Sequence, residues 1–125
     1  MREAAAGNAL YWVVRQCQDG GFVGLCDLSE LRGPQAEIGF RFVRRLWGLG
    51  FAREAVLCIL AQARALGLAS VRARIHRDND RSARLLARAG FREIDLLPHV
   101  EIRSGVFRDC RLFAIDLVDP EGSRH

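Results

Sequence analysis

One stretch of the sequence decides the fold: residues 36–55, which read AEIGFRFVRRLWGLGFAREA. Ile38, Phe40 and Phe42 alternate with polar or small residues, and this period of two predicts a half-buried strand over residues 36–43. A turn with glycines at 48 and 50 follows, and apolar residues then recur at helical spacing as far as residue 63, with Gly67 as the expected C-terminal stop. We therefore expect a strand, a glycine turn and a helix of about four turns.

The segments on either side predict an α/β (α+β) fold with one mixed sheet. Two strand-like runs, residues 10–15 and 22–28, come first, and Asp19-Gly20-Gly21 is typical of a hairpin turn between them. After the long helix we expect a strand at 71–75, a second helix capped by Asp78 or Asn79, and two strands near 93–103 and 106–118. Pro98 predicts a bulge in the first of those two strands. The predicted order is β-β-β-α-β-α-β-β.

Composition restricts the class of protein. A chain of 125 residues, 50% apolar and 27% charged, is typical of one globular domain. No apolar run approaches the roughly 20 residues of a membrane helix, and the N-terminus lacks the apolar core of a secretion signal, so we expect a cytoplasmic protein with no membrane partner. The four cysteines, at positions 17, 26, 58 and 110, form no C-x-x-C pair, which argues against a metal site and favours buried, reduced thiols.

The charge balance favours anionic partners. All 19 residues counted as Lys+Arg are arginines, and against 15 acidic residues they give a formal net charge of +4. The arginines are scattered, however, and Tyr11, Trp12 and Trp47 form no aromatic platform with them. We therefore do not expect a nucleic acid as partner. A strongly salt-dependent affinity for DNA or RNA would revive that alternative.

The glycine turn is the stretch with the clearest binding chemistry. The start of a helix exposes unpaired N–H groups and a partial positive charge, and glycines let a phosphate approach the backbone closely. A P-loop is excluded because the chain has no lysine, and the dinucleotide fingerprint is excluded because Arg53 stands where a small residue is needed. From spacing alone, a turn that merely connects strand to helix explains the glycines equally well.

Three motifs in order change that balance. They are A-E-I-G-F at 36–40, R-L-W-G-L-G-F-A-R-E-A at 45–55, and N-D-R-S-A-R-L-L-A-R-A-G-F at 79–91. Over roughly residues 10–117 the sequence closely resembles the GNAT superfamily of acetyl-CoA-dependent N-acetyltransferases, and it is similar to the branch that acetylates ribosomal-protein N-termini and related amines. The resemblance implies a single GNAT domain over residues 1–125, splayed between the third and fourth predicted strands, with acetyl-CoA as co-substrate and no metal.

The resemblance also implies which residues bind the cofactor. In such enzymes the amides of the R-x-x-G-x-G turn hold the CoA pyrophosphate, the preceding strand pairs with the pantetheine arm, and polar residues of the second helix lie near that arm. The residues carried over are Phe42, Val43, Arg45, Leu46, Trp47, Gly48, Leu49, Gly50, Phe51, Ala52, Arg53, Asn79, Ser82 and Arg84. Arg84 and, less favoured, Arg88 would meet the 3′-phosphate, with a solvated helix face as the alternative. An N–H near Phe42 or Val43 would stabilise the oxyanion.

The implied reaction is acetyl transfer to a primary amine by direct attack on the thioester. The acceptor is a protein N-terminal α-amine or a small-molecule amine. Glu37 is the candidate general base, with an ordinary exposed strand residue as the alternative. Ser82, or water, is the candidate proton donor, because many members use a tyrosine after the N-x-x-S segment and the single tyrosine here is Tyr11.

The front of the chain departs from the family pattern. Members usually have a strand and two helices before the segment that matches residues 10–15, and here at most residues 1–9 precede it. A truncated chain, a misassigned start or a partner that completes the site would each explain this, and we expect an apolar patch and association, with a homodimer as one form. The alternative function is a catalytically incompetent, CoA-binding or regulatory fragment.

Overall fold

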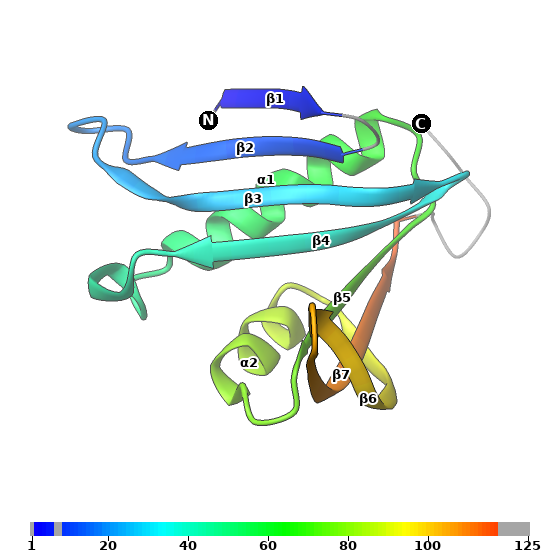
Figure 1. Cartoon of the computed structure of the whole chain (residues 1–125). Coiled ribbons are helices and arrows are strands. Elements are labelled where there is room, and N and C mark those ends of the chain that lie inside the picture. Colours follow the sequence, from blue (N-terminus) through cyan, green and yellow to red (C-terminus); the bar gives the residue numbers. More distant parts are fainter. Residues whose placement is uncertain (1, 7–8, 118–125) are drawn as a thin grey trace.

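The computed structural model describes residues 2–6 and 9–117, which form one seven-stranded sheet and two helices (Figure 1). The helices are α1 (Phe51–Ala65) and α2 (Asp80–Arg88), and a turn of 3-10 helix, η1 (Arg44–Leu46), precedes α1. The sheet order is β1-β2-β3-β4-β5-β7-β6, which confirms the predicted mixed α/β class. The strands are β1 (Arg2–Ala6), β2 (Ala9–Arg15), β3 (Phe22–Arg32), β4 (Gln35–Phe42), β5 (Ser70–His76), β6 (Arg92–Arg103) and β7 (Val106–Asp116).

The first strand, β1, is an addition to the predicted order. Its sequence is rich in alanine, which has little intrinsic preference for strands, so periodicity gave no signal. It forms because the free edge of β2 supplies hydrogen-bond partners, in the antiparallel register that places Ala4 opposite Tyr11. The sheet therefore has one more strand than predicted, at its edge.

The sheet opens between β4 and β5. These two strands are parallel, and their register joins only Gln35–Glu37 with Ser70–Arg72. Beyond that short pairing the strands diverge, so β1–β4 and β5–β7 form the two arms of a V (Figure 1). Parallel neighbours need a long crossover, and here the crossover is α1. The predicted splay between the third and fourth predicted strands, which are β4 and β5, is confirmed.

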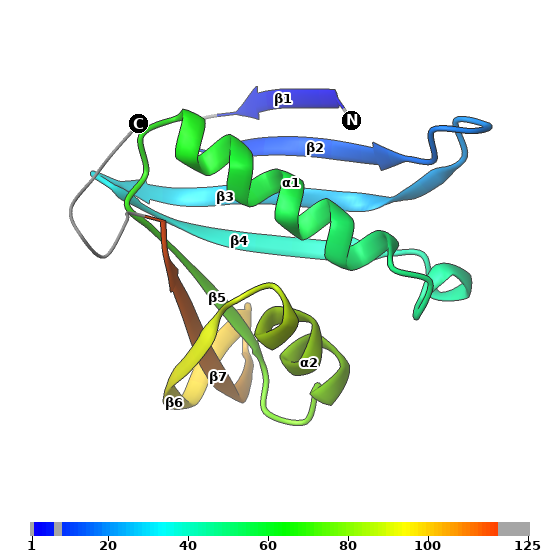
Figure 2. The ribbon, with the colours of Figure 1, turned by 180° about the vertical axis from the view of Figure 1, so that it is seen from behind.

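Each helix covers one arm of the V. Figure 2 shows α1 lying along β2–β4 and α2 beside β5–β7. The predicted apolar stripe of α1 is buried, with Val56, Ile59 and Leu60 at most 2% exposed. It packs with inward side chains of the strands, such as Trp12 and Leu28. The opposite face of β2–β4 carries no helix from the described part of the chain (Figures 1 and 2).

Several predicted local features are present. Gly67, with φ +85°, follows the end of α1, and Asn79 is the N-cap of α2. The register of β6 with β7 shifts between Leu97 and Val100, which confirms the bulge at Pro98. The strand predicted over 36–43 ends one residue earlier, at Phe42, because the chain turns into η1. Residue 118, the predicted end of the last strand, lies outside the described residues.

The prediction of buried thiols is half wrong. Cys26 and Cys110 are buried, whereas Cys17 lies exposed in the β2–β3 turn and Cys58 is exposed on the solvent side of α1. Helical periodicity brings positions 56, 59, 60 and 63 to the sheet and leaves 58 on the outer side. All four cysteines are free thiols. No helix among the described residues has the length and apolar character needed to cross a membrane.

Candidate active site

The turn between β4 and α1 presents a row of unused main-chain donors. Gly48 and Gly50 have φ of +82° and +88°, and a Cβ at either would meet nothing within 4 Å, so conformation and not crowding requires glycine there. No side chain caps α1, and no described acceptor receives the N–H groups of residues 48–53. The first amide in use is that of Glu54, bonded to Gly50 O at 3.1 Å. These free donors, at the positive end of the helix dipole, suit a pyrophosphate.

Trp47 joins this turn to both arms of the sheet. Its indole N–H donates to the main-chain oxygen of Phe42 at 3.1 Å, at the end of β4. The guanidinium carbons of Arg81 and Arg44 lie 4.5 and 5.4 Å from the centre of its ring, within the range of cation–π attraction. Arg81 belongs to the first turn of α2, so one aromatic ring connects the turn, β4 and α2.

Three of the predicted phosphate-binding arginines are free of internal partners. Arg45, Arg53 and Arg84 are exposed, and none of them forms an ion pair with a carboxylate in the described ranges. They come from η1, the first turn of α1, and α2. A guanidinium without a protein carboxylate is available for bidentate bonds to phosphate.

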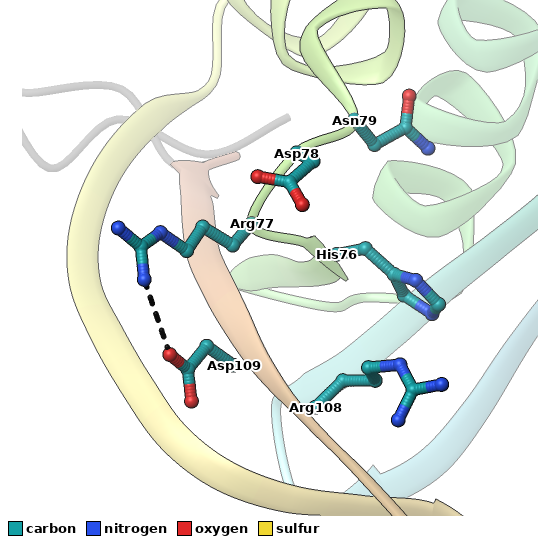
Figure 3. Close-up of a pocket in the computed structure, with 6 residues that line it drawn as sticks. All are labelled: His76, Arg77, Asp78, Asn79, Arg108 and Asp109. Atoms are coloured by element: carbon teal, nitrogen blue, oxygen red, sulfur yellow. Dashed lines mark hydrogen bonds and ion pairs between the residues drawn. The ribbon is translucent and has the colours of Figure 1, made fainter.

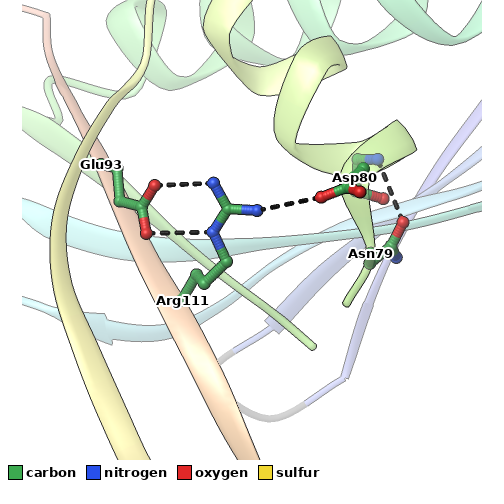
Figure 4. Close-up of polar contacts among 5 residues, drawn as sticks. Asn79, Asp80, Glu93 and Arg111 are labelled. Carbon is green, nitrogen blue, oxygen red and sulfur yellow. Dashed lines mark hydrogen bonds and ion pairs between the residues drawn. The ribbon is translucent and has the colours of Figure 1, made fainter. Parts of the chain in front are cut away.

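The predicted pair Asn79 and Ser82 forms the cap of α2. Asn79 Oδ1 accepts the main-chain N–H of Ser82 at 3.1 Å, as an N-cap residue does (Figure 4). Neither the Asn79 amide nitrogen nor the Ser82 hydroxyl bonds to another described group, so both are free to meet a ligand. The cap thus explains why Asn79 Oδ1 contacts the Ser82 main chain, but it gives no structural role to the Asn79 amide nitrogen or the Ser82 hydroxyl.

Arg111 of β7 anchors the start of α2. It donates to both Glu93 oxygens, at 2.7 and 3.0 Å, and its third nitrogen lies 3.5 Å from Asp80 Oδ1 (Figure 4). These bonds hold the pKa of Glu93 below its ordinary value. Arg111 thereby ties the β6–β7 hairpin to the helix that carries Asn79 and Arg81. Sequence reasoning missed this anchor, since its members come from three separate elements.

One of the two predicted oxyanion donors is already in use. The N–H of Val43 donates to Val23 O at 2.8 Å, so it continues the β3–β4 ladder. Because backbone groups alternate along a strand, the N–H of Phe42 points to the other side, into the gap between β4 and β5. Val43 is therefore excluded as the donor, and Phe42 is the candidate that remains.

Glu37 lies in a hollow on the sheet face opposite the helices. Its carboxylate accepts a bond from Arg74 Nε at 3.0 Å, and the two side chains are 25% and 37% exposed. The hollow has a volume of about 220 Å³. Its lining consists of Glu37, Arg74, His76, Val100, Glu101, Ile102 and Cys110. Burial raises the pKa of the Cys110 thiol, which keeps that wall of the hollow uncharged.

A second hollow of about 650 Å³ adjoins the first at His76, which lines both. Figure 3 shows that His76 and Arg108 point to one side of it, while Arg77 and Asp109 form an ion pair of 3.4 Å on the other. Asn79 also lines this hollow, at the start of α2. The strand that carries Glu37 and the start of α2 therefore border two hollows that share His76 as a wall residue.

Comparison with known proteins decides the family. The sequence profile of the acetyltransferase (GNAT) domain matches residues 1–92. The chain belongs to the GNAT acetyltransferase family. This GNAT chain is 30% identical over 96 residues to the uncharacterized N-acetyltransferase YoaA of Bacillus subtilis, and 30% identical to the uncharacterized N-acetyltransferase p20 of Bacillus licheniformis. The matches cover 76% and 74% of this chain but only 54% of each relative, so the chain spans about half the length of the curated relatives it matches.

Solved structures show that the GNAT fold is present. Spermidine N-acetyltransferase from Vibrio cholerae, in complex with CoA and spermine, superposes with a TM-score of 0.78 at 23% identity, over 88% of this chain and 66% of that one. A chimera of the Vibrio cholerae enzyme gives a TM-score of 0.79 at 23% identity, over 88% of this chain and 68% of the other. At this identity the likeness concerns the fold.

The open face of this GNAT domain differs from the predicted apolar patch. Tyr11 and Leu25 are exposed there, at 45% and 44%, but Asp27, Glu37 and Arg41 lie on the same face of β3 and β4. Alternation along the strands places these charged residues opposite the core, so the surface is mixed. Large apolar side chains are also exposed on β6, at the edge of the sheet, where Ile94 and Leu96 are 46% and 51% exposed.

Proposed function

We propose that this GNAT domain transfers an acetyl group from acetyl-CoA to a primary amine by direct attack on the thioester. The observation that carries the proposal is the row of unpartnered amides at residues 48–53, beside exposed, unpaired arginines, at the wide end of the gap between β4 and β5. Anion-binding amides, a gap that admits an extended arm, and a hollow with a carboxylate on the far side are the parts that such a transfer needs.

The cofactor side is formed by η1, the glycine turn and α1. The free amides of residues 48–53 and the guanidinium groups of Arg45 and Arg53 would hold the pyrophosphate, whereas the amides of Leu46 and Trp47 are already bonded to Val43 and Arg44 oxygens within the turn. Phe42 lines the arm, Asn79 and Ser82 lie beside it, and Arg84 meets the 3′-phosphate. Acetyl-CoA supplies the activated carbonyl. The Phe42 N–H, which faces the gap, would stabilise the negative charge that develops on the carbonyl oxygen during attack.

The acceptor side is the hollow at Glu37. Its carboxylate would take a proton from the ammonium group of the acceptor, so that the neutral amine can attack the thioester, and Arg74 at 3.0 Å fixes the orientation of the carboxylate. Ser82 or water would return a proton to the departing thiolate. How much a base contributes depends on the acceptor, since a peptide α-amine has a pKa of about 7.7–8.0 and an alkyl amine such as lysine about 10.4.

The acceptor is a small-molecule amine or a protein N-terminal α-amine. The motif resemblance favours the ribosomal-protein branch, whereas the Vibrio cholerae enzyme of similar fold binds spermine. We place the activity in the cytoplasm, because the four cysteines are free thiols as expected in a reducing compartment. We further propose that residues 1–125 act as one acetyltransferase domain.

The experiment that tests the function has two steps. Isothermal calorimetry with coenzyme A first shows whether the turn binds the cofactor. Thiol release from acetyl-CoA is then followed with a panel of alkyl amines, polyamines and short peptides. Binding together with amine-dependent release supports the enzyme, and binding without release from any amine supports the alternative of a CoA-binding regulatory fragment. Absence of CoA binding would refute both.

A further inference from the structure

Asp27 is a carboxylate on the open sheet face that pairs with no cationic side chain among those the structure describes. It lies in the middle of β3, directly between Tyr11 of β2 and Gly39 of β4 in the strand register. No arginine, histidine or other cationic group among residues 9–30 and 33–117 comes within 4 Å of it, whereas Glu37 on the same face is paired with Arg74. Arg41 shares this face, opposite Leu25, but forms no ion pair with Asp27.

The surroundings of Asp27 oppose its charge. The side chain is half-buried, and burial raises the pKa of its carboxyl above the ordinary value, although a bond from the Ser29 hydroxyl acts in the other direction. Partial burial of a carboxylate without a partner has a cost in free energy, which a cation bound from outside would offset. Binding of a positive ligand would therefore stabilise Asp27 more than Glu37, because Glu37 is already paired with Arg74.

Gly39 makes the room in which this carboxylate lies. A Cβ at Gly39 would stand 2.7 Å from Asp27 Oδ2 and 3.1 Å from Oδ1, closer than side chains allow. Gly39 does not have a positive φ, so its backbone conformation does not require glycine. The missing side chain instead lets the Asp27 carboxylate extend over β4, the strand that borders the gap and carries Glu37. Tyr11, exposed on the other side, offers an aromatic face to a cation.

We infer that Asp27 binds the second ammonium group of a diamine or polyamine acceptor whose reacting amine lies at Glu37. This rests on the proposed function and deepens it by naming the substrate class. Ser29 is opposite Glu37 in the register, which makes Asp27 and Glu37 diagonal neighbours, about 7–8 Å apart by strand geometry. A short alkyl diamine spans that separation. A peptide α-amine has no second charge at this distance and gains nothing from Asp27.

The test compares 1,4-diaminobutane with n-butylamine as acceptors under saturating acetyl-CoA. Asp27→Asn is expected to raise KM for the diamine by at least about 10-fold, the loss of one charge-assisted bond, and to change KM for the monoamine by less than about 2-fold. Gly39→Ala keeps the charge but displaces the carboxylate, so it should act in the same direction. Asp116→Asn removes an exposed carboxylate on β7 and is the control that should alter neither KM.

Two further measurements, thermal unfolding and direct binding of the diamine, distinguish a ligand-binding role of Asp27 from a structural role. Because the amide removes a half-buried, unpartnered charge, Asp27→Asn should unfold at the same temperature as the parent protein or higher. The CoA-loaded protein is titrated with 1,4-diaminobutane, or the free protein is used if CoA does not bind. The titration should shift the Tyr11 ring resonances in NMR spectra, and Asp27→Asn should abolish the shift. Equal effects on both amines, unchanged KM in Asp27→Asn, or no Tyr11 shift in the parent protein would each overturn the inference. Failure of coenzyme A to bind would refute the proposed function. The Tyr11 titration would then decide by itself whether Asp27 binds a diamine.

Discussion

The indole N–H of Trp47 is donated to the main-chain oxygen of Phe42 at 3.1 Å. This bond turns the end of β4 back onto the glycine turn, and it uses a carbonyl that faces the gap. The same ring contacts Arg81 of α2, so one side chain connects α2 directly to the turn. The arrangement makes Trp47 a structural support of the glycine turn.

Trp47→Ala should weaken binding of coenzyme A by about 10-fold, because it removes a hydrogen bond and a cation–π contact that hold the turn. Isothermal calorimetry measures the effect. Arg64→Ala, an exposed change in the last turn of α1, at the opposite end from the glycine turn, is the control and should leave the affinity unchanged. An unaltered Kd for Trp47→Ala would show that the turn holds its shape without the indole.

Gly50→Ala should lower both stability and cofactor affinity. At φ +88° the new Cβ costs about 1–2 kcal/mol, and relief of that strain would reorient the amides that begin α1. Gly33→Ala is the control, since Gly33 also has a positive φ (+56°) and open space around it but lies in the β3–β4 turn. Thermal unfolding should show a loss for both variants. Calorimetry with coenzyme A should show a loss for Gly50→Ala alone.

Glu37→Gln should lower kcat for an alkyl amine by about 10²–10⁴-fold, the usual contribution of a general base, without changing the Kd for coenzyme A. The effect should be smaller for a peptide α-amine, which is already partly neutral near pH 8. Glu101→Gln is the matched control, because Glu101 lines the same hollow but is bonded to the Gly105 N–H at 3.1 Å. Equal activity of Glu37→Gln and the parent protein would reduce Glu37 to an ordinary strand residue.

Glu93 should make stability fall on acidification. Arg111 lowers the pKa of Glu93 in the folded state, so the stabilising contribution is present above the ordinary value of 4.5 and disappears as pH falls through the lower, folded-state value. The group is largely exposed, so the contribution should stay below about 1 kcal/mol. Thermal unfolding midpoints are measured from about pH 7 to about pH 3, a range that covers the titration of a glutamate. The midpoint should fall less over this range in Glu93→Gln than in the parent protein. Parallel curves would contradict the assignment.

We predict that the protein self-associates through β6. This edge strand exposes Ile94 and Leu96, and an unpaired strand edge can pair with a second copy. Leu96→Asp should then shift sedimentation towards the monomer across a concentration series. Leu66→Asp is the control, because this side chain is 53% exposed beyond the end of α1, and it should leave the sedimentation unchanged. A parent protein that sediments as a monomer throughout would disprove the homodimer.

Local pattern was sufficient for most of the fold. The stripe of α1, the alternation of β4 and the glycines at 48, 50 and 67 depend on neighbours within a few residues, and their periodicity is visible in the chain itself. The motifs at 36–55 and 79–91 were sufficient to assign the family. The addition of β1 and the exposure of Cys17 and Cys58 were not predicted, because the first depends on the free edge of β2 and the others on which side of an element meets solvent.

What the sequence determined by itself was therefore the order of elements, the glycine turn and the row of amides that follows from it, since a helix start and a positive φ are local properties. Only the tertiary structure decided that Arg74 reaches Glu37, that Arg81 covers Trp47, that Val43 donates to β3 and not to the gap, and that Asp27 lies over Gly39. Each of these contacts joins residues from different elements, and their distances are set by strand register and by the packing of α1 and α2 on the two arms of the sheet.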